Sequence, residues 1–264
     1  MDRRKKLYIT IFVLLGIYFV VMFIFVIYPA MKDGKRETYV IVNNDAKWKY
    51  EDRKWQDISI GEKKLYNWQK FDIYQNQKEL GNYFLLDSNG WHIYDDERNP
   101  VKKDGVSLFA IRSNQDYEFA FYDTVDVDQE NIGYVEEVLN EHNITTRDFT
   151  VCEMFSYDLD QEGEEEKVFT VSNMFITEYT TVPRNIFNFI FVVDSGKIIP
   201  VLEEVDTYDK MYHHCSASVA YVVDLDGNGT FELITSCSYY SNQGTCIELY
   251  EKVHGKYEKV KSCE

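Results

Sequence analysis

Asp224-Leu225-Asp226-Gly227-Asn228-Gly229-Thr230-Phe231-Glu232 is the stretch of this chain that most constrains its fold. It places carboxylate or amide oxygens at its first, third, fifth and ninth positions, with a glycine sixth, where a tight loop bends. Such hard oxygen ligands suit a calcium ion, which would also remove the repulsion between neighbouring carboxylates. The alternative is a solvated acidic turn, because Asp, Asn and Gly favour turns in any case. The predicted ligands are Asp224, Asp226, Asn228, Thr230 through its backbone carbonyl, and Glu232.

The segments on either side of this loop predict strands. Residues 218–223 and 231–235 are rich in β-branched and aromatic side chains, which are typical of strands. An EF-hand would instead need flanking helices and a glutamate at the twelfth loop position, which is Thr235 here. The loop is therefore predicted to connect two strands.

A second copy of the loop begins 66 residues earlier, as Asp158-Leu159-Asp160-Gln161-Glu162-Gly163-Glu164-Glu165-Glu166. It too lies between β-rich segments, and a repeat at fixed spacing is typical of repeat architectures. Its predicted ligands are Asp158, Asp160, Glu162 and Glu166. Glu162 stands where the later copy has Asn228, and its longer side chain would crowd the predicted ion site. This copy is therefore expected either to bind an ion or to remain an acidic turn.

The order strand, D-x-D-x-[DN]-G-x-x-[DE] loop, strand resembles the FG-GAP/VCBS repeats of integrin-like β-propellers. The resemblance covers residues 146–264, and it implies a structural calcium ion in each loop and one propeller blade per repeat. The expected fold is mainly β, with propeller-like repeats of antiparallel strands and one amphipathic helix, preceded by a single N-terminal transmembrane helix. Two repeats do not close a propeller, so a closed propeller would need degenerate blades from the N-terminal half. The alternatives are an incomplete propeller-like assembly and a separate N-terminal β domain.

Residues 33–145 predict a β-rich region with one helix near its end. Short runs rich in β-branched and aromatic residues, such as 38–42 and 107–111, alternate with turn signals. Apolar residues at helical spacing then predict a helix from about Gln129 to His142, packed on a sheet. The residues of this apolar stripe are Ile132, Val135, Val138 and Leu139.

The N-terminus predicts a membrane anchor. Four basic residues, Arg3 to Lys6, precede an uncharged run from Leu7 to Tyr28. At about 1.5 Å per residue this run reaches roughly 33 Å as a helix, enough to cross a bilayer core. Because positive flanks stay in the cytoplasm, residues 1–6 are predicted to be a cytoplasmic tail and residues 7–29 an uncleaved signal anchor. The rest of the chain would be extracytoplasmic, and a cleaved signal peptide is the alternative.

The charge of the chain restricts its partners. The chain carries a net charge of −17, whereas nucleic-acid binding depends on Lys and Arg contacts to phosphates. We therefore expect bound cations and no nucleic acid. The first functional hypothesis is a membrane-anchored, extracytoplasmic calcium-binding β-repeat protein that serves as a binding module for an extracellular protein or glycan. The alternative is an anchored cell-envelope hydrolase with its site in the N-terminal β region.

Motifs of catalysis are absent from the sequence. It contains no G-x-S-x-G, H-E-x-x-H, P-loop or dinucleotide fingerprint. His213 and Cys215 would share one face of a strand, but no nucleophile motif surrounds them, so no catalytic residue is predicted.

Five cysteines lie beyond the predicted anchor: Cys152, Cys215, Cys237, Cys246 and Cys263. Cys237 and Cys246 flank a turn signal at residues 241–244 and form the best candidate disulfide, which would persist outside the cell. The alternative is that the cysteines are reduced and serve as small core residues.

Overall fold

The computed structural model describes residues 37–43, 46–51, 53–59, 62, 67–75, 78–87, 91–101, 108–145, 148–174, 185–207, 215–239 and 245–262. The predicted tail and anchor, residues 1–29, lie outside these described residues. Within the described part, no helix has both the length and the apolar character needed to cross a membrane.

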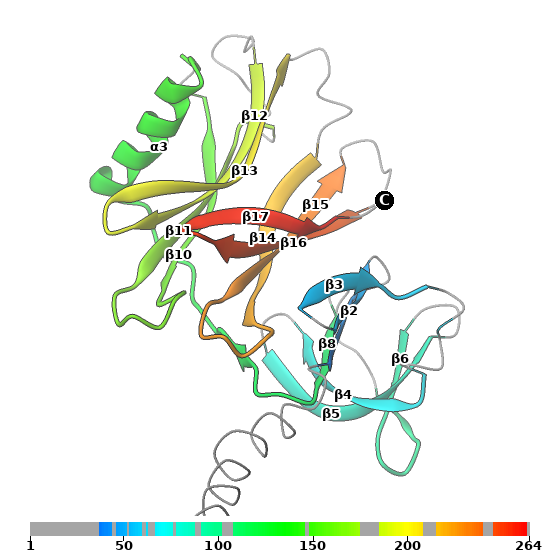
Figure 1. Cartoon of the computed structure of the whole chain (residues 1–264). Helices are drawn as coiled ribbons and strands as arrows, with labels where there is room; N and C mark the ends of the chain where they lie inside the picture. The colour runs from blue at the N-terminus through cyan, green and yellow to red at the C-terminus, as the bar shows by residue number, and fades with distance from the viewer. Residues whose placement is uncertain are drawn as a thin grey trace, which may run out of the picture.

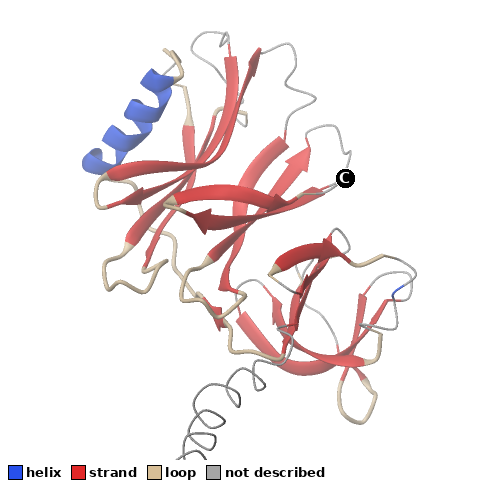
Figure 2. Ribbon diagram, viewed as in Figure 1, coloured by secondary structure: helices blue, strands red, loops and turns tan. Residues whose placement is uncertain are grey.

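The described chain forms antiparallel β-sheets with one α-helix (Figures 1 and 2), which confirms the predicted mainly β fold with one helix. The N-terminal sheet has eight strands in the spatial order β3-β2-β1-β8-β4-β5-β6-β7 and does not close into a barrel. Its strands are β1 (Glu37–Val42), β2 (Ala46–Glu51), β3 (Lys54–Asp57), β4 (Gln69–Gln75), β5 (Lys78–Asp87), β6 (Trp91–Tyr94), β7 (Pro100–Val101) and β8 (Phe109–Ser113).

Two further sheets contain the predicted repeats. The first repeat sheet consists of β10 (Thr150–Tyr157), β11 (Glu166–Ser172), β12 (Asn185–Asp194) and β13 (Lys197–Thr207), in that order. The second repeat sheet consists of β14 (Cys215–Asp224), β15 (Glu232–Tyr239), β16 (Thr245–Val253) and β17 (Lys256–Lys261), with the short strand β9 (Glu118–Phe119) added beside β14.

The two repeat sheets share one layout. Each is a meander of four antiparallel strands, with an acidic loop between its first and second strands and a tight turn between its third and fourth. Both tight turns have two residues in the left-handed region: Ser195 and Gly196 have φ values of 49° and 78°, and His254 and Gly255 have values of 51° and 75°. Positive φ at both central residues is what a two-residue hairpin turn requires.

The sheets stack in layers, with the second repeat sheet in the middle. One of its faces packs on the first repeat sheet, with Phe231 and Leu233 against Phe155 and Ile190. Its other face packs on the N-terminal sheet through a cluster that includes Tyr221, Leu249, Val40, Phe109 and Ile111. The curved N-terminal sheet buries its remaining face against itself, in a cluster that includes Ile41, Phe71 and Ile93 (Figure 1).

The helix α3 (Gln129–Glu141) covers the outer face of the first repeat sheet (Figure 1). Asp128 caps its N-terminus, because its side chain accepts a hydrogen bond from the Asn131 backbone N–H at 2.8 Å. Of the predicted apolar stripe, Val135, Val138 and Leu139 are buried and Ile132 is half-buried. Val135, Val138 and Leu139 pack against phenylalanines of β11 and β12. Full burial of an apolar side chain of this kind stabilises a fold by about 1.5–3 kcal/mol. The helix thus belongs to the first repeat rather than to the N-terminal sheet.

Two cysteines of the second repeat are oxidised. Cys237 and Cys246 lie opposite each other in the register of β15 and β16, and both are disulfide-bonded. The alternative that these two thiols are reduced core residues is therefore wrong, while their pairing with each other stays a prediction. Cys152 is an exposed free thiol. Cys263 lies outside the described residues, as do the 241–244 turn and the side chain of Cys215.

Candidate functional site

The first acidic loop (residues 158–166) and the second acidic loop (residues 224–232) share the same internal hydrogen bonds. The last glutamate of each loop turns back and accepts the backbone N–H of the second residue. The distance is 2.7 Å both from Leu159 N to Glu166 Oε2 and from Leu225 N to Glu232 Oε2. The carboxylate at the ninth position therefore points into the loop in both repeats.

The first aspartate of each loop accepts the backbone N–H of the glycine at the sixth position. Gly163 N lies 3.0 Å from Asp158 Oδ2, and Gly229 N lies 2.9 Å from Asp224 Oδ2. Gly163 and Gly229 have φ values of 93° and 85°, in the region that favours glycine. The sequence prediction that glycine permits the bend at this position is confirmed.

The two loops contact each other directly. The Phe231 backbone N–H donates a hydrogen bond to the Leu159 carbonyl oxygen at 2.8 Å. The rings of Tyr157 and Phe231 meet edge to face, with centroids 5.1 Å apart. Figure 1 shows both loops at the same end of the repeat sheets. The predicted ion sites therefore lie side by side.

The first acidic loop brings three of its four predicted ligands together. Oxygens of Asp158, Asp160 and Glu166 all lie within 4.8 Å of one another, and of the described side chains this is the one such acidic group. Asp158 Oδ1 is buried and has no hydrogen-bond partner. Burial raises the pKa of the Glu166 carboxyl, despite its bond to the Leu159 N–H. The fourth predicted ligand, Glu162, is exposed and lies outside the group.

Lys252 of β16 supplies a positive charge to the first acidic loop. Its Nζ lies 2.8 Å from Asp160 Oδ2 and 3.2 Å from Asp194 Oδ2, and its side chain is 12% exposed. Burial acts to raise the pKa of Asp160, but the hydrogen bond and charge of Lys252 outweigh burial and hold that pKa below its ordinary value. The second repeat therefore contributes a positively charged side chain to the acidic loop of the first repeat.

The second acidic loop has a more open arrangement of carboxylates than its spacing predicts. Asp224, Asp226 and Glu232 do not form a compact group like that of the first loop. Asp226 Oδ2 accepts a hydrogen bond from the Tyr50 hydroxyl at 3.1 Å, and Asn228 Oδ1 accepts the Thr230 N–H at 2.7 Å. All four predicted side-chain ligands of this loop, Asp224, Asp226, Asn228 and Glu232, thus accept hydrogen bonds from protein donors.

The negative charge of the second acidic loop has no basic partner among the described residues. Asp224 is 4% exposed and Glu232 is 3% exposed, and no Lys or Arg of the described chain forms an ion pair with either of them. Burial raises the pKa of both carboxyls, that of Glu232 well above its ordinary value. Burial also raises the pKa of nearby Glu251. A bound cation would stabilise the ionised forms of these groups.

The N-terminal sheet holds the second acidic loop in place. The Leu225 carbonyl oxygen accepts hydrogen bonds from Thr38 Oγ1 at 3.3 Å and Gln115 Nε2 at 3.2 Å. Gly227 has a φ of 67°, and a Cβ atom there would lie 2.6 Å from the Asp116 carbonyl oxygen. Only glycine fits this position without a shift of the backbone.

Comparisons of the chain with protein-family models, curated proteins and solved structures find no match. The resemblance to FG-GAP/VCBS repeats therefore rests on the two loops and on the layout that their sheets share. His213 and His214 lie outside the described residues.

The sequence did not reveal which side chains of other sheets contact the acidic loops. Lys252 and Tyr50 reach the loops only through the stacking of sheets. No local motif marks these residues, because their positions depend on contacts between distant segments.

Proposed function

We propose that this chain is a membrane-anchored, extracytoplasmic calcium-binding β-repeat protein that serves as a binding or interaction module at the cell surface. The observation that carries the proposal is the duplication of one loop geometry. Both acidic loops fold their first and ninth carboxylates inward through the same backbone hydrogen bonds. A duplicated inward-facing set of carboxylates fits ion ligation better than an acid–base pair, which would place its two carboxyls in contrasting environments.

The residues that would hold calcium differ between the loops. In the first loop they are Asp158, Asp160 and Glu166, with the buried and unpartnered Asp158 Oδ1 available to an ion. In the second loop they are Asp224, Asp226 and Glu232, with Asn228 and the Thr230 carbonyl completing the oxygen set. The ion would supply positive charge to the loops and stabilise the fold, and no chemical step is assigned to it.

The propeller-like assignment is part of the same proposal. Each blade of a propeller is a four-stranded antiparallel sheet. The two repeat sheets fit this description, and the N-terminal sheet, with its eight strands, would take the place of further blades. The alternative of a cell-envelope hydrolase stays a prediction, since no geometry among the described residues favours it.

Calcium should raise the thermal stability of the full-length chain. At a calcium concentration about a hundredfold above Kd, binding of one ion adds about 2.7 kcal/mol to the free energy of unfolding. For a chain of this size, that raises Tm by about 5 to 10 °C. Differential scanning calorimetry with calcium and with a chelator measures the shift. Asp224→Ala should remove much of it, because this variant loses a central ligand of the second loop.

Glu164→Gln is the matched control, because Glu164 is an exposed acid of the first loop that no predicted ligand set includes. Its calcium shift should equal that of the unaltered chain. A Tm that calcium leaves unchanged in the unaltered chain would contradict the calcium assignment. An equal shift in Asp224→Ala and the unaltered chain would contradict the assignment for the second loop.

A further inference from the structure

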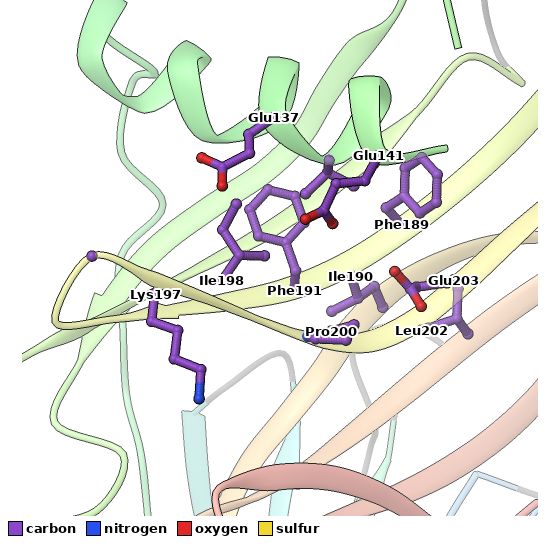
Figure 3. Close-up of a pocket in the computed structure, with 12 residues that line it drawn as sticks. Glu137, Glu141, Phe189, Ile190, Phe191, Lys197, Ile198, Pro200, Leu202 and Glu203 are labelled. Atoms are coloured by element: carbon purple, nitrogen blue, oxygen red, sulfur yellow. The ribbon is translucent and has the colours of Figure 1, made fainter. Parts of the chain in front are cut away.

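A groove lies between α3 and the hairpin of β12 and β13 (Figure 3), and its described lining includes no residue of either acidic loop. Its volume is about 420 Å³, within the range of sites that hold small organic molecules. The groove exists because α3 covers the phenylalanines of β11 and β12 but leaves the side of β13 open.

The floor of the groove is apolar. Phe189 and Phe191 of β12, together with Val138 of α3 and Ile198 of β13, form its base. In Figure 3 Phe189, Phe191 and Ile198 gather between the helix and the hairpin. Such a floor favours the apolar body of a ligand.

Three carboxylates surround the groove. Glu137 and Glu141 extend from α3 one helical turn apart, and Glu203 lies on β13 (Figure 3). Neither helix carboxylate forms an ion pair or hydrogen bond with any described residue. Like charges at this helical spacing repel each other and destabilise the helix slightly. A cation in the groove would relieve this repulsion.

The orientation of Glu203 is held by His142, the C-terminal cap of α3. His142 Nε2 lies 3.0 Å from Glu203 Oε1, and the imidazole stacks on the Phe189 ring with centroids 4.9 Å apart. Lys197 also lines the groove, but Figure 3 shows its amine directed away from the three carboxylates. The described lining therefore presents acidic groups without a lysine or arginine bound to them.

We propose that this groove binds a small organic cation, an ammonium or guanidinium group attached to an apolar body. The apolar body would lie on Phe189 and Phe191, and the cationic group would donate charge-assisted hydrogen bonds to Glu141 and Glu203. The net charge of −17 attracts cations to the molecule and repels anions. The groove shares no lining residue with the acidic loops, and the proposed binding does not require calcium.

Phenethylamine is a suitable probe, because it joins one ring to one ammonium group by a short stem. Isothermal titration of the full-length chain in calcium-free buffer should give a Kd of about 1 mM or tighter for a ligand of this size. Phenethyl alcohol, which has the same shape without the charge, should bind at least about fivefold more weakly, and phenylacetate should not bind.

The double variant Glu141→Gln/Glu203→Gln should weaken phenethylamine binding by at least about fivefold. Glu130→Gln is the control: it removes one negative charge from the exposed first turn of the same helix, outside the groove. Its affinity should match that of the unaltered chain, and the Tm of each variant reports whether the fold is intact. The proposal is overturned if the amine fails to bind, if the alcohol binds equally well, or if the double variant binds as the unaltered chain does.

Discussion

A single lysine makes the two acidic loops unequal. Lys252 lies against Asp160 and Asp194 with a largely buried side chain, so the first loop already contains a positive charge. The second loop has neutral protein donors, such as the Tyr50 hydroxyl, but no basic partner among the described residues. If calcium binds the first loop, it competes with the charge of Lys252 for the same carboxylates. At the scale of residues, affinity should therefore depend on this lysine.

Lys252→Met should strengthen the calcium response of the first loop. In the Asp224→Ala background, which isolates the first loop, we expect calcium to raise Tm more when the lysine is replaced than when it is kept, because one repulsive charge is gone. Without calcium the same variant should lose about 2 kcal/mol, since Asp160 and Asp194 lose their partner. Scanning calorimetry in both conditions measures the two effects.

Lys259→Met is the control for this lysine. Lys259 forms an ion pair with Glu248 at 2.9 Å, on the same sheet and apart from both acidic loops. Its removal should leave the calcium-induced rise in Tm unchanged. A rise that is equal or smaller in Lys252→Met would show that the lysine does not oppose the ion.

At the scale of elements, the second acidic loop packs closely against the backbone at Asp116. Gly227→Ala combines a left-handed φ with a Cβ atom 2.6 Å from the Asp116 carbonyl oxygen. We expect the free energy of unfolding to fall by about 3 kcal/mol, which lowers Tm by about 6 to 12 °C. Gly196→Ala has a similar φ of 78° but open space around it, so it should cost only about 1 kcal/mol. Equal losses would contradict the packing argument.

Elements that depend on residues close together in the sequence could be predicted. The acidic loops follow from spacing within nine positions, and α3 follows from the apolar period that buries Val135, Val138 and Leu139. The order of the eight-stranded sheet was not predictable, since β1 pairs with β8 across most of the N-terminal half. The contacts of Lys252 and Tyr50 with the loops likewise depend on how separate sheets stack. Residue spacing also favoured the second loop over the first as an ion site. Spacing within a loop contains no information about donors, such as Lys252, that approach from distant segments.

At the scale of the whole molecule, a carboxyl lies at the contact between the repeat sheets. Glu153 of β10 has a buried Oε2 without a hydrogen-bond partner. Burial raises the pKa of Glu153 to about 7, and a hydrogen bond from the Val219 backbone lowers it only in part. The folded chain therefore binds more protons at this group than the unfolded chain does between about pH 4.5 and about pH 7. Stability from Glu153 is complete below this window and is lost as pH rises through it.

The full-length chain, without calcium, should lose about 2 kcal/mol of stability from Glu153 between about pH 5 and about pH 7.5. The net charge of −17 acts in the same direction, because repulsion within the folded state grows as carboxyls ionise. Glu153→Gln should flatten the pH dependence by that amount, measured from denaturant unfolding at each pH. Glu258→Gln removes an acid from an exposed position of β17 and reports the effect of net charge alone. Matching pH profiles in the two variants would mean that repulsion across the whole surface, rather than the carboxyl between the sheets, governs the loss of stability.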